Sequence, residues 1–237
     1  MRDRDTLGDD AGRVLNLFSL IVFWLLLGVA SSFHAQAQTP EPNRIRIEYA
    51  PPTNPEHLAL HDLLKGKAVL ERIQTLLSPF RLPRPLTFRT AGCDGEINAW
   101  FDTDAVTICY EYVAYVLEAA ASRNRPDWVS ENHAITGPLI DVFLHEGAHA
   151  LFAYLDIPLL GREEDAADQV AAFLLLGLGR ADTPQLIGGI VYLYLNEAGI
   201  SRFPKLGRKR IKLVDYKHDA DVHSTPLQRM FNTLCLA

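Results

Sequence analysis

Residues 139–155 read Leu-Ile-Asp-Val-Phe-Leu-His-Glu-Gly-Ala-His-Ala-Leu-Phe-Ala-Tyr-Leu, and this stretch decides the fold. It is rich in helix formers and apolar on nearly every side, which predicts a buried central helix. On a helix, His145 and His149 lie one turn apart on one face, with about 6 Å between their Cβ atoms, so both imidazoles can bind one metal ion. Glu146, beside the first histidine, is placed to take a proton from a metal-activated water.

An ordinary helix without a metal is the alternative interpretation of this motif. Two histidines and a glutamate buried there would leave unpaired polar atoms costing about 1–3 kcal/mol each, whereas one zinc ion would satisfy the set. Gly147 costs about 1 kcal/mol relative to alanine inside a helix, so we expect another backbone to approach closely there. Asp141, one turn before His145, is either the acceptor for the outer N–H of that imidazole or a solvated or capping residue.

The acidic segment that follows starts a second expected helix, 163–176, and offers the third ligand. Acidic residues at a helix start also favour the helix dipole, by about 0.3–1 kcal/mol each. Glu164 and Asp168 are four residues apart and share a face. We predict that Glu164 binds the metal and that Asp168 accepts a hydrogen bond from the outer nitrogen of a ligand imidazole. Glu163 and Asp165 remain alternative ligands.

The two histidines and glutamate on one helix, followed by Glu-x-x-x-Asp on the next, resemble the glutamate-ligand zincins. Thermolysin-like enzymes and the membrane-associated prenyl-protein proteases belong to that group. From His145 to Asn232 the chain is similar to a bacterial family of "putative metallopeptidases", domain of unknown function 4344. That resemblance implies a zincin fold, one catalytic Zn²⁺ ion and hydrolysis of peptide or protein substrates.

The segment Asn98-Ala99-Trp100-Phe101 is similar to the edge strand with which thermolysin-like enzymes hold substrate backbone. The resemblance implies that Asn98 and Ala99 bind substrate. An ordinary amphipathic strand is the alternative, and an exposed edge would suit the addition of a peptide strand.

His223, followed six residues later by Arg229, is similar to the C-terminal His-Pro segment of the prenyl-protein proteases, although Ser224 stands at the proline position. The resemblance implies that His223 is catalytic, stabilising the oxyanion, and that Arg229 braces the site. The alternative is that His223 caps a helix.

Residues 1–37 are excluded from the expected fold. An apolar run over 14–30 and the small-x-small sequence Ala35-Gln36-Ala37 predict a signal peptide, which leaves a domain over 38–237. The leading charges lack a positive bias, and a run of about 17 apolar residues approaches the minimum for a membrane span, so an uncleaved anchor is the alternative. Either way we expect an exported protein, periplasmic or secreted, or held at the inner membrane.

Composition agrees with a globular domain, because 48% of the 237 residues are hydrophobic. The net charge of -6 does not favour nucleic-acid binding. A basic cluster between Arg202 and Lys212 is interpreted as a solvated loop, with a flap over the site as the alternative. Cys93 and Cys109 flank an expected hairpin and could form a disulfide, which would leave Cys235 as a buried free thiol, although pairing with Cys235 stays open.

We therefore predict an α+β, zincin-like domain with a small mixed or antiparallel sheet, whose edge strand packs on a mainly helical body. The predicted function is that of a zinc metallopeptidase. The rival is an exported binding or scaffold protein that keeps the fold without hydrolysing peptides. Expected strands cover 45–49, 86–89, 97–101 and 106–109, and expected helices cover 57–77, 112–121, 137–155, 163–176, 184–197 and 226–234.

Overall fold

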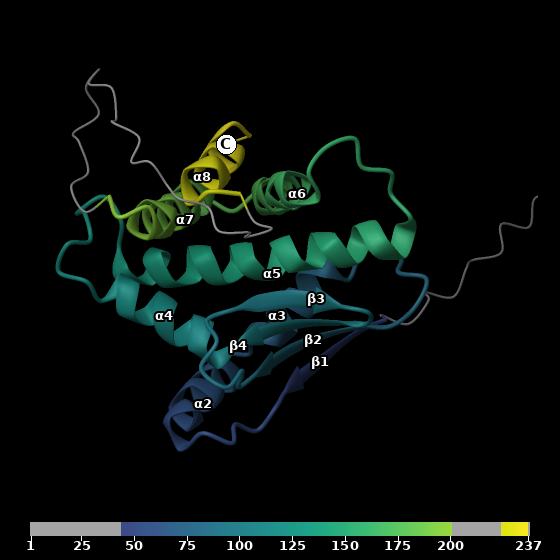
Figure 1. The fold of residues 1–237 in the computed structure, drawn as a ribbon, viewed down its shortest axis with the longest axis horizontal. Coiled ribbons are helices and arrows are strands. Elements are labelled where there is room, and N and C mark those ends of the chain that lie inside the picture. Colours follow the sequence, from purple (N-terminus) through teal and green to yellow (C-terminus); the bar gives the residue numbers. More distant parts are fainter. Residues whose placement is uncertain (1–43, 201–223, 237) are drawn as a thin grey trace, which may run out of the picture. The chain divides into compact units, whose positions relative to one another are not determined.

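A computed structural model describes residues 44–200 and 224–236 of the chain. The expected leader over 1–37, the basic cluster and His223 lie outside the described residues. The described fold is α+β, as predicted, with a four-stranded sheet and a larger helical part (Figure 1). The strands are β1 (Ile45–Tyr49), β2 (Leu86–Ala91), β3 (Ala99–Asp102) and β4 (Ala105–Cys109).

Two α-helices separate β1 from the other three strands, and the remaining helices follow β4. A short 3-10 helix over Pro55–His57 precedes the first α-helix. The α-helices are α2 (Leu58–Gly66), α3 (Val69–Leu77), α4 (Tyr110–Ala120), α5 (Glu131–Leu155), α6 (Glu163–Gly177), α7 (Thr183–Glu197) and α8 (Pro226–Leu234). No helix that the structure describes combines the length and apolarity needed to cross a membrane.

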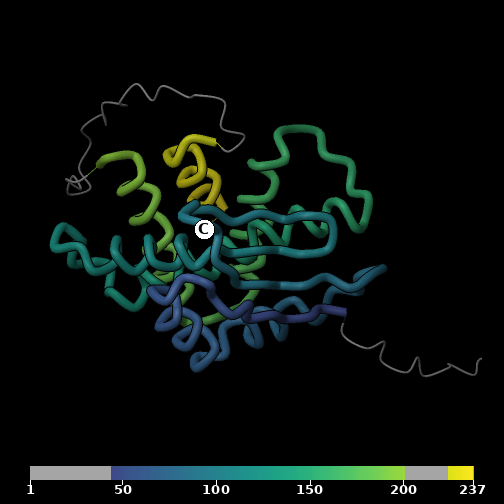
Figure 2. Tube along the Cα trace, turned by 60° about the horizontal axis from the view of Figure 1, so that its bottom comes forward, coloured from purple at the N-terminus to yellow at the C-terminus, as the bar shows by residue number. Residues whose placement is uncertain are grey.

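The sheet is mixed, in the order β1-β2-β4-β3. The first three strands in this order are parallel, while β3 runs antiparallel to β4 and forms one edge, with Ala99 opposite Ile108. Figure 2 shows the row of strands from purple β1 to the teal hairpin of β3 and β4. The parallel pairs are possible because α2 and α3 cross over between β1 and β2.

One face of the sheet packs against α3 and α5. In β2, Leu86, Phe88 and Thr90 are buried in alternation with less buried neighbours. A Cβ atom on Gly147 would lie 3.5 Å from the Phe88 ring and 3.7 Å from the Leu77 side chain. The expectation of a close backbone at Gly147 is therefore wrong. A Cβ atom at this position would make ordinary van der Waals contacts with side chains of the sheet and of α3.

The expected helix over 57–77 is broken into α2 and α3. Gly66 ends α2, and Ala68 takes a left-handed conformation with φ of 51°. One backbone N–H in the first turn of α3 finds its acceptor outside the helix: the Leu70 N–H donates to the Tyr49 hydroxyl at 2.8 Å. This side-chain cap lets the chain change direction so that α3 can bury its own apolar face, formed by Leu70, Ile73 and Leu77.

The central helix α5 starts six residues earlier than the predicted Gly137. Ser130 caps it by accepting the His133 N–H at 3.2 Å, and Pro138 lies inside the helix rather than at its start. The helix ends at Asp156, whose φ of 49° is left-handed. The expected start at Gly137 is too late because the Ser130 side chain caps the helix about two turns before Pro138.

Helices α6, α7 and α8 lie on the side of α5 that faces away from the sheet (Figure 1). Helix α7 crosses α5 with backbone in contact with backbone. A Cβ atom on Gly137 would lie 2.3 Å from the Leu186 carbonyl oxygen, and one on Gly189 would lie 1.9 Å from the His133 carbonyl oxygen. Alanine would not fit at either position. Helix α6 packs on α5 through Ala167, Ala171 and Ala172, each at most 1% exposed.

The two cysteines around the hairpin are joined, so the disulfide between Cys93 and Cys109 is confirmed. Cys235 is free but exposed, which corrects the expectation of a buried thiol. It lies at the end of α8, where the chain faces solvent.

Candidate metal centre

Helix α5 places the two motif histidines side by side. Their ring centroids are 4.9 Å apart, and their Nε2 atoms approach each other to 3.3 Å. The His145 side chain is 1% exposed and the His149 side chain 12% exposed. The pair thus has one buried member and one member at the solvent boundary.

Helix α6 adds a carboxylate to the pair. Oxygens of Glu164 lie 3.1 Å from His145 Nε2 and 3.6 Å from His149 Nε2. One donor atom from each of the three side chains falls within 4.8 Å of the others. The other two acidic candidates face elsewhere: Glu163 approaches the outer nitrogen of His149, and Asp165 accepts a hydrogen bond from Ser224 Oγ at 2.6 Å.

The outer nitrogen of His145 faces a buried carboxylate. Nδ1 lies 3.0 Å from Asp168 Oδ1 and 3.2 Å from Arg229 Nη2. Arginine can only donate, so Nδ1–H must donate to Asp168, and the contact with Arg229 is not a hydrogen bond. Arg229 Nε instead donates to Asp168 at 3.0 Å, and Asn232 Nδ2 donates to its other oxygen at 3.2 Å.

The outer nitrogen of His149 has a different partner. Its Nδ1 lies 2.8 Å from Glu163 Oε1, and this glutamate side chain is 55% exposed. With both Nδ1–H groups donating to carboxylates, each imidazole in its neutral form carries its lone pair on Nε2. These lone pairs face each other and Glu164.

The electrostatics of the site favour a bound cation. Burial lowers the pKa of His145, but hydrogen bonds with Asp168 and Glu164 outweigh burial and raise the pKa to about 9. Burial likewise lowers the pKa of His149, while Glu164 and Glu163 raise it above its usual value. Three electron-rich atoms facing one another repel unless a proton or a metal ion lies among them. Two imidazole nitrogens and one carboxylate oxygen are a fitting donor set for a divalent metal ion.

Glu146 is buried beside the first ligand candidate. Glu146 is only 4% exposed, and its carboxylate is not one of the three donor groups of His145, His149 and Glu164. Asn98 and Ala99 lie at the start of the edge strand β3, which packs against α5. The Ala99 N–H donates to Asn98 Oδ1 at 2.8 Å.

Asp141 does not contact the outer nitrogen of His145. It is 6% exposed and accepts a hydrogen bond from the Tyr194 hydroxyl at 2.7 Å. Burial raises the pKa of Asp141, partly offset by the charge of Arg229. Both alternatives weighed for this residue, a histidine partner and a solvated or capping residue, are therefore corrected to a buried partner of α7.

Two contributors were missed at the sequence level. Glu163 was weighed only as a ligand or a dipole residue, and its contact with His149 depends on how α6 turns toward α5. Asn232 joins Asp165 and Asp168 and had no assigned role. The spacing could have indicated a role for Asn232. It follows Arg229 by three residues in the Gln-Arg-Met-Phe-Asn segment, and residues three apart share a helix face.

Comparison with known proteins gives one match. No curated protein and no solved structure matches the chain. A family model described as "Putative metallopeptidase" matches residues 49–237, which include every described element from α2 onward. The metal-binding potential of the site and this match agree, and the chain belongs to the DUF4344 metallopeptidase family.

Proposed function

We propose that the chain is a zinc-dependent peptidase in which His145, His149 and Glu164 bind one zinc ion. The distances among the donor groups carry the proposal. The two Nε2 atoms lie 3.3 Å apart, and Glu164 places one oxygen 3.1 Å from His145 Nε2 and its other oxygen 3.6 Å from His149 Nε2. Ligands at about 2.0–2.1 Å from a tetrahedral zinc are about 3.3–3.4 Å apart, so the donors need little movement to bind the ion. Three protein ligands also leave a fourth position for water or substrate.

Two carboxylates prepare the histidines for this role. Asp168 accepts the Nδ1–H of His145, and Glu163 accepts the Nδ1–H of His149. Each hydrogen bond fixes the tautomer with a lone pair on Nε2 and orients the ring. Arg229 holds Asp168 in turn, so we propose that it braces the site indirectly rather than touching substrate.

Peptide hydrolysis needs an activated water and a base. Zinc supplies Lewis acidity, which lowers the pKa of water from about 15.7 to about 7 and polarises a carbonyl group. We propose that the Glu146 carboxylate takes the proton of the attacking water and passes it to the leaving amine. His223, outside the described residues, keeps its proposed role as the donor to the oxyanion.

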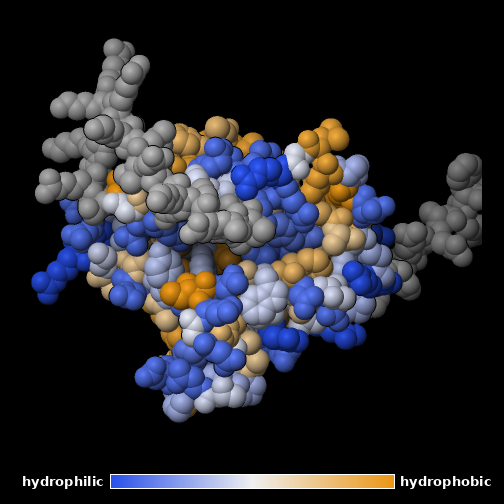
Figure 3. Space-filling model, viewed as in Figure 1, coloured by the Kyte–Doolittle hydropathy of each residue, from blue (hydrophilic) through white to orange (hydrophobic). Residues whose placement is uncertain are grey.

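We propose that a peptide or protein substrate binds along the surface around the site. The edge strand β3 is paired on one side only, so Asn98 and Ala99 are proposed to receive an extended peptide. The loop between α5 and α6 exposes apolar side chains (Figure 3), with Leu160 104% and Ile157 41% exposed. Leu160 precedes Glu163 by three residues. Apolar substrate side chains would find contacts there.

Export is also proposed, on the leader over residues 1–37 and the domain over 38–237. The disulfide between Cys93 and Cys109 suits an oxidising compartment, where such bonds persist. Cell fractionation with an antibody against the chain tests the proposal. Recovery in the periplasm or medium supports a cleaved signal peptide, the membrane fraction supports an anchor, and the cytoplasm contradicts both.

Metal analysis of purified protein, combined with a peptide-cleavage assay, tests the enzyme proposal. Wild type should hold one zinc ion per chain, and Glu146→Gln should keep the zinc while losing hydrolysis. Glu164→Gln should lose zinc as well. A folded wild type that takes up no metal would overturn the proposal. Bound zinc without cleavage of any member of a diverse peptide library would favour the rival scaffold protein.

A further inference from the structure

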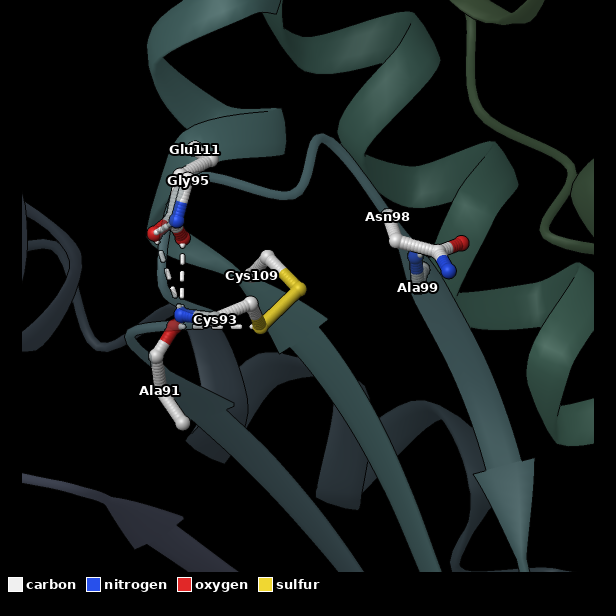
Figure 4. The surroundings of a disulfide bond; sticks show 7 residues. All are labelled: Ala91, Cys93, Gly95, Asn98, Ala99, Cys109 and Glu111. Carbon is white, nitrogen blue, oxygen red and sulfur yellow. Dashed lines mark hydrogen bonds between the residues drawn. A yellow bond between two sulfur atoms is a disulfide. The ribbon is translucent and has the colours of Figure 1, made fainter.

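The loop over 92–98 leads from β2 directly into the edge strand and is fixed at several points (Figure 4). Cys93 forms the disulfide with Cys109, the last residue of β4. At the far end of the loop, the Cys109 N–H donates to the Asn98 carbonyl oxygen at 3.1 Å. One residue of the central strand therefore holds both ends of the loop.

Glu111, in the first turn of α4, holds the same loop through its carboxylate. Both of its oxygens lie 3.0 Å from the Cys93 nitrogen, and one also accepts the Gly95 N–H at 3.0 Å (Figure 4). Asp94 and Gly95 have φ of 54° and 96°, which turns successive N–H groups toward the carboxylate. Burial would raise the pKa of Glu111, but these backbone donors hold it below its usual value.

The other end of β3 rests on the helix that carries the histidines. The Phe101 ring meets the Tyr154 ring edge to face, with centroids 5.9 Å apart. Tyr154 follows His149 by five residues on α5. Besides its pairing with β4, the strand β3 is therefore held near its two ends, by the aromatic contact at Phe101 and by the fixed loop that ends at Asn98.

We infer that Glu111 and the Cys93–Cys109 disulfide form a clamp that positions the edge strand for peptide binding. This inference rests on the proposed peptidase function. Glu111 is a positioning residue, because it acts through the loop and Asn98 rather than on the reacting atoms. A loosened loop lets the Asn98 end of β3 take more positions while the rest of the strand stays paired with β4, so a peptide must order that end as it binds. Substrate affinity should fall, while the metal and the base keep their places.

Substitution of Glu111 by alanine tests the clamp, with Glu118→Ala as the matched control. Glu118 lies on the same helix but is exposed. With a pool of internally quenched octapeptides, Glu111→Ala should raise KM about tenfold and change kcat less than twofold. Zinc content should stay at the wild-type level. Glu111→Gln, which keeps an acceptor oxygen, should restore part of the affinity, and Glu118→Ala should match wild type.

The disulfide provides a second, independent variant. Cys93→Ser combined with Cys109→Ser should raise KM in the same way, whereas Cys235→Ser should not, because Cys235 is exposed and unpaired. All assays run well below the melting temperature of each variant, so that a loss of stability alone cannot raise KM. Equal KM values for wild type, Glu111→Ala and the double serine variant would overturn the clamp and leave the peptidase proposal intact.

Binding without cleavage separates this inference from the proposed function. Labelled octapeptides of the same pool are titrated into wild type and Glu111→Ala and followed by fluorescence anisotropy. If wild type binds peptides more tightly than Glu111→Ala but cleaves none, the clamp is supported and the peptidase proposal fails. If wild type neither binds nor cleaves them, both fail.

Discussion

The two histidines of α5 have the same proposed role in unequal surroundings. His145 is 1% exposed, and its partner Asp168, 2% exposed, is itself held by two side chains of α8. His149 is 12% exposed, and its partner Glu163 is 55% exposed. One imidazole is thus oriented by a buried network that reaches across the helical part, and the other by a single contact at the surface.

This difference shows that equal hydrogen bonds need not carry equal weight. Breaking a buried charged network leaves its remaining members without water or partners, whereas an exposed pair gives way to solvent at little cost. The contacts around His145 (the His145 side, formed by Asp168 and its partners on α8) should therefore control both the stability of the fold and the affinity for metal. The contact between His149 and Glu163 (the His149 side) should affect metal affinity alone.

Asp168→Ala should have the largest effect. It leaves the Arg229 guanidinium and the His145 Nδ1–H without their carboxylate, and breaking such a buried pair costs about 3–5 kcal/mol of unfolding free energy. Zinc affinity should fall about 10–100-fold. Urea unfolding and zinc titration measure both, with Asp127→Ala, an exposed aspartate, as the control. A loss of less than about 1 kcal/mol would remove the distinction between the two sides.

The stability of the metal-free protein should depend on pH through the protonation of the buried His145. The pKa of His145 is raised from 6.5 to about 9. The folded state then binds this proton more tightly than the unfolded state, so its stabilisation is complete below pH 6.5 and lost as pH rises through 9. The urea midpoint of chelator-treated protein should fall over this window. Saturating zinc, which replaces the proton, should flatten the curve, and a midpoint that is already flat without zinc would contradict the prediction.

Glu197 should make the folded protein less stable as pH rises, which is the opposite of what a carboxylate with a lowered pKa does. Burial raises its pKa from 4.5 to about 7, although the charge of Arg229 partly lowers it. The ionised carboxylate is disfavoured in the folded state, so wild type should lose stability relative to Glu197→Gln as pH rises from 4.5 to 7. Melting temperatures of the two proteins should coincide at pH 4.5 and separate at pH 8. Glu118→Gln serves as the exposed control, and a constant difference across this range would rule out the titration.

Glu163→Gln should have the smallest effect. Its contact with His149 is exposed, so zinc affinity should fall at most about tenfold and the unfolding free energy should change by less than about 0.5 kcal/mol. Zinc titration with a competing chelator and urea unfolding measure the two quantities, and Glu131→Gln on α5 is the control. A stability loss as large as that of Asp168→Ala would show that the two histidines are held alike.

The main features of the fold could be predicted because local periodicity decided them. The expected helices over 163–176 and 184–197 match α6 and α7 to within one residue at each end, and the disulfide is the pairing that the expected hairpin suggested, although pairing with Cys235 had stayed open. The failures arose where distant contacts decide. The break at Ala68 depends on the Tyr49 hydroxyl, and the expected start of α5 missed the cap that the Ser130 side chain forms with the His133 N–H.

In the candidate metal centre, too, local spacing was predictable and distant contacts were not. Residues four apart on one helix necessarily share a face, which made the His145 and His149 pair and the Glu164 and Asp168 pair predictable from spacing. The partners of Asp141 and the second role of the acidic segment were not predictable. They depend on the rotation of α6 and α7 about their axes against α5, and glycines such as Gly189 set that packing through contacts between distant backbones.

The hydrogen bond between Asp168 and Arg229 also affects when the site can form during synthesis of the chain. Arg229 follows Asp168 by 61 residues. At about 5–20 residues per second, a ribosome needs about 3–12 s to add it. During that interval the nascent chain already contains both histidines, Glu164 and Asp168, but the arginine that holds the Asp168 carboxylate in place has not yet been added. A chain interrupted before this arginine would leave the Asp168 carboxylate without the guanidinium that holds it, so the candidate metal centre is complete only once α8 has been synthesised.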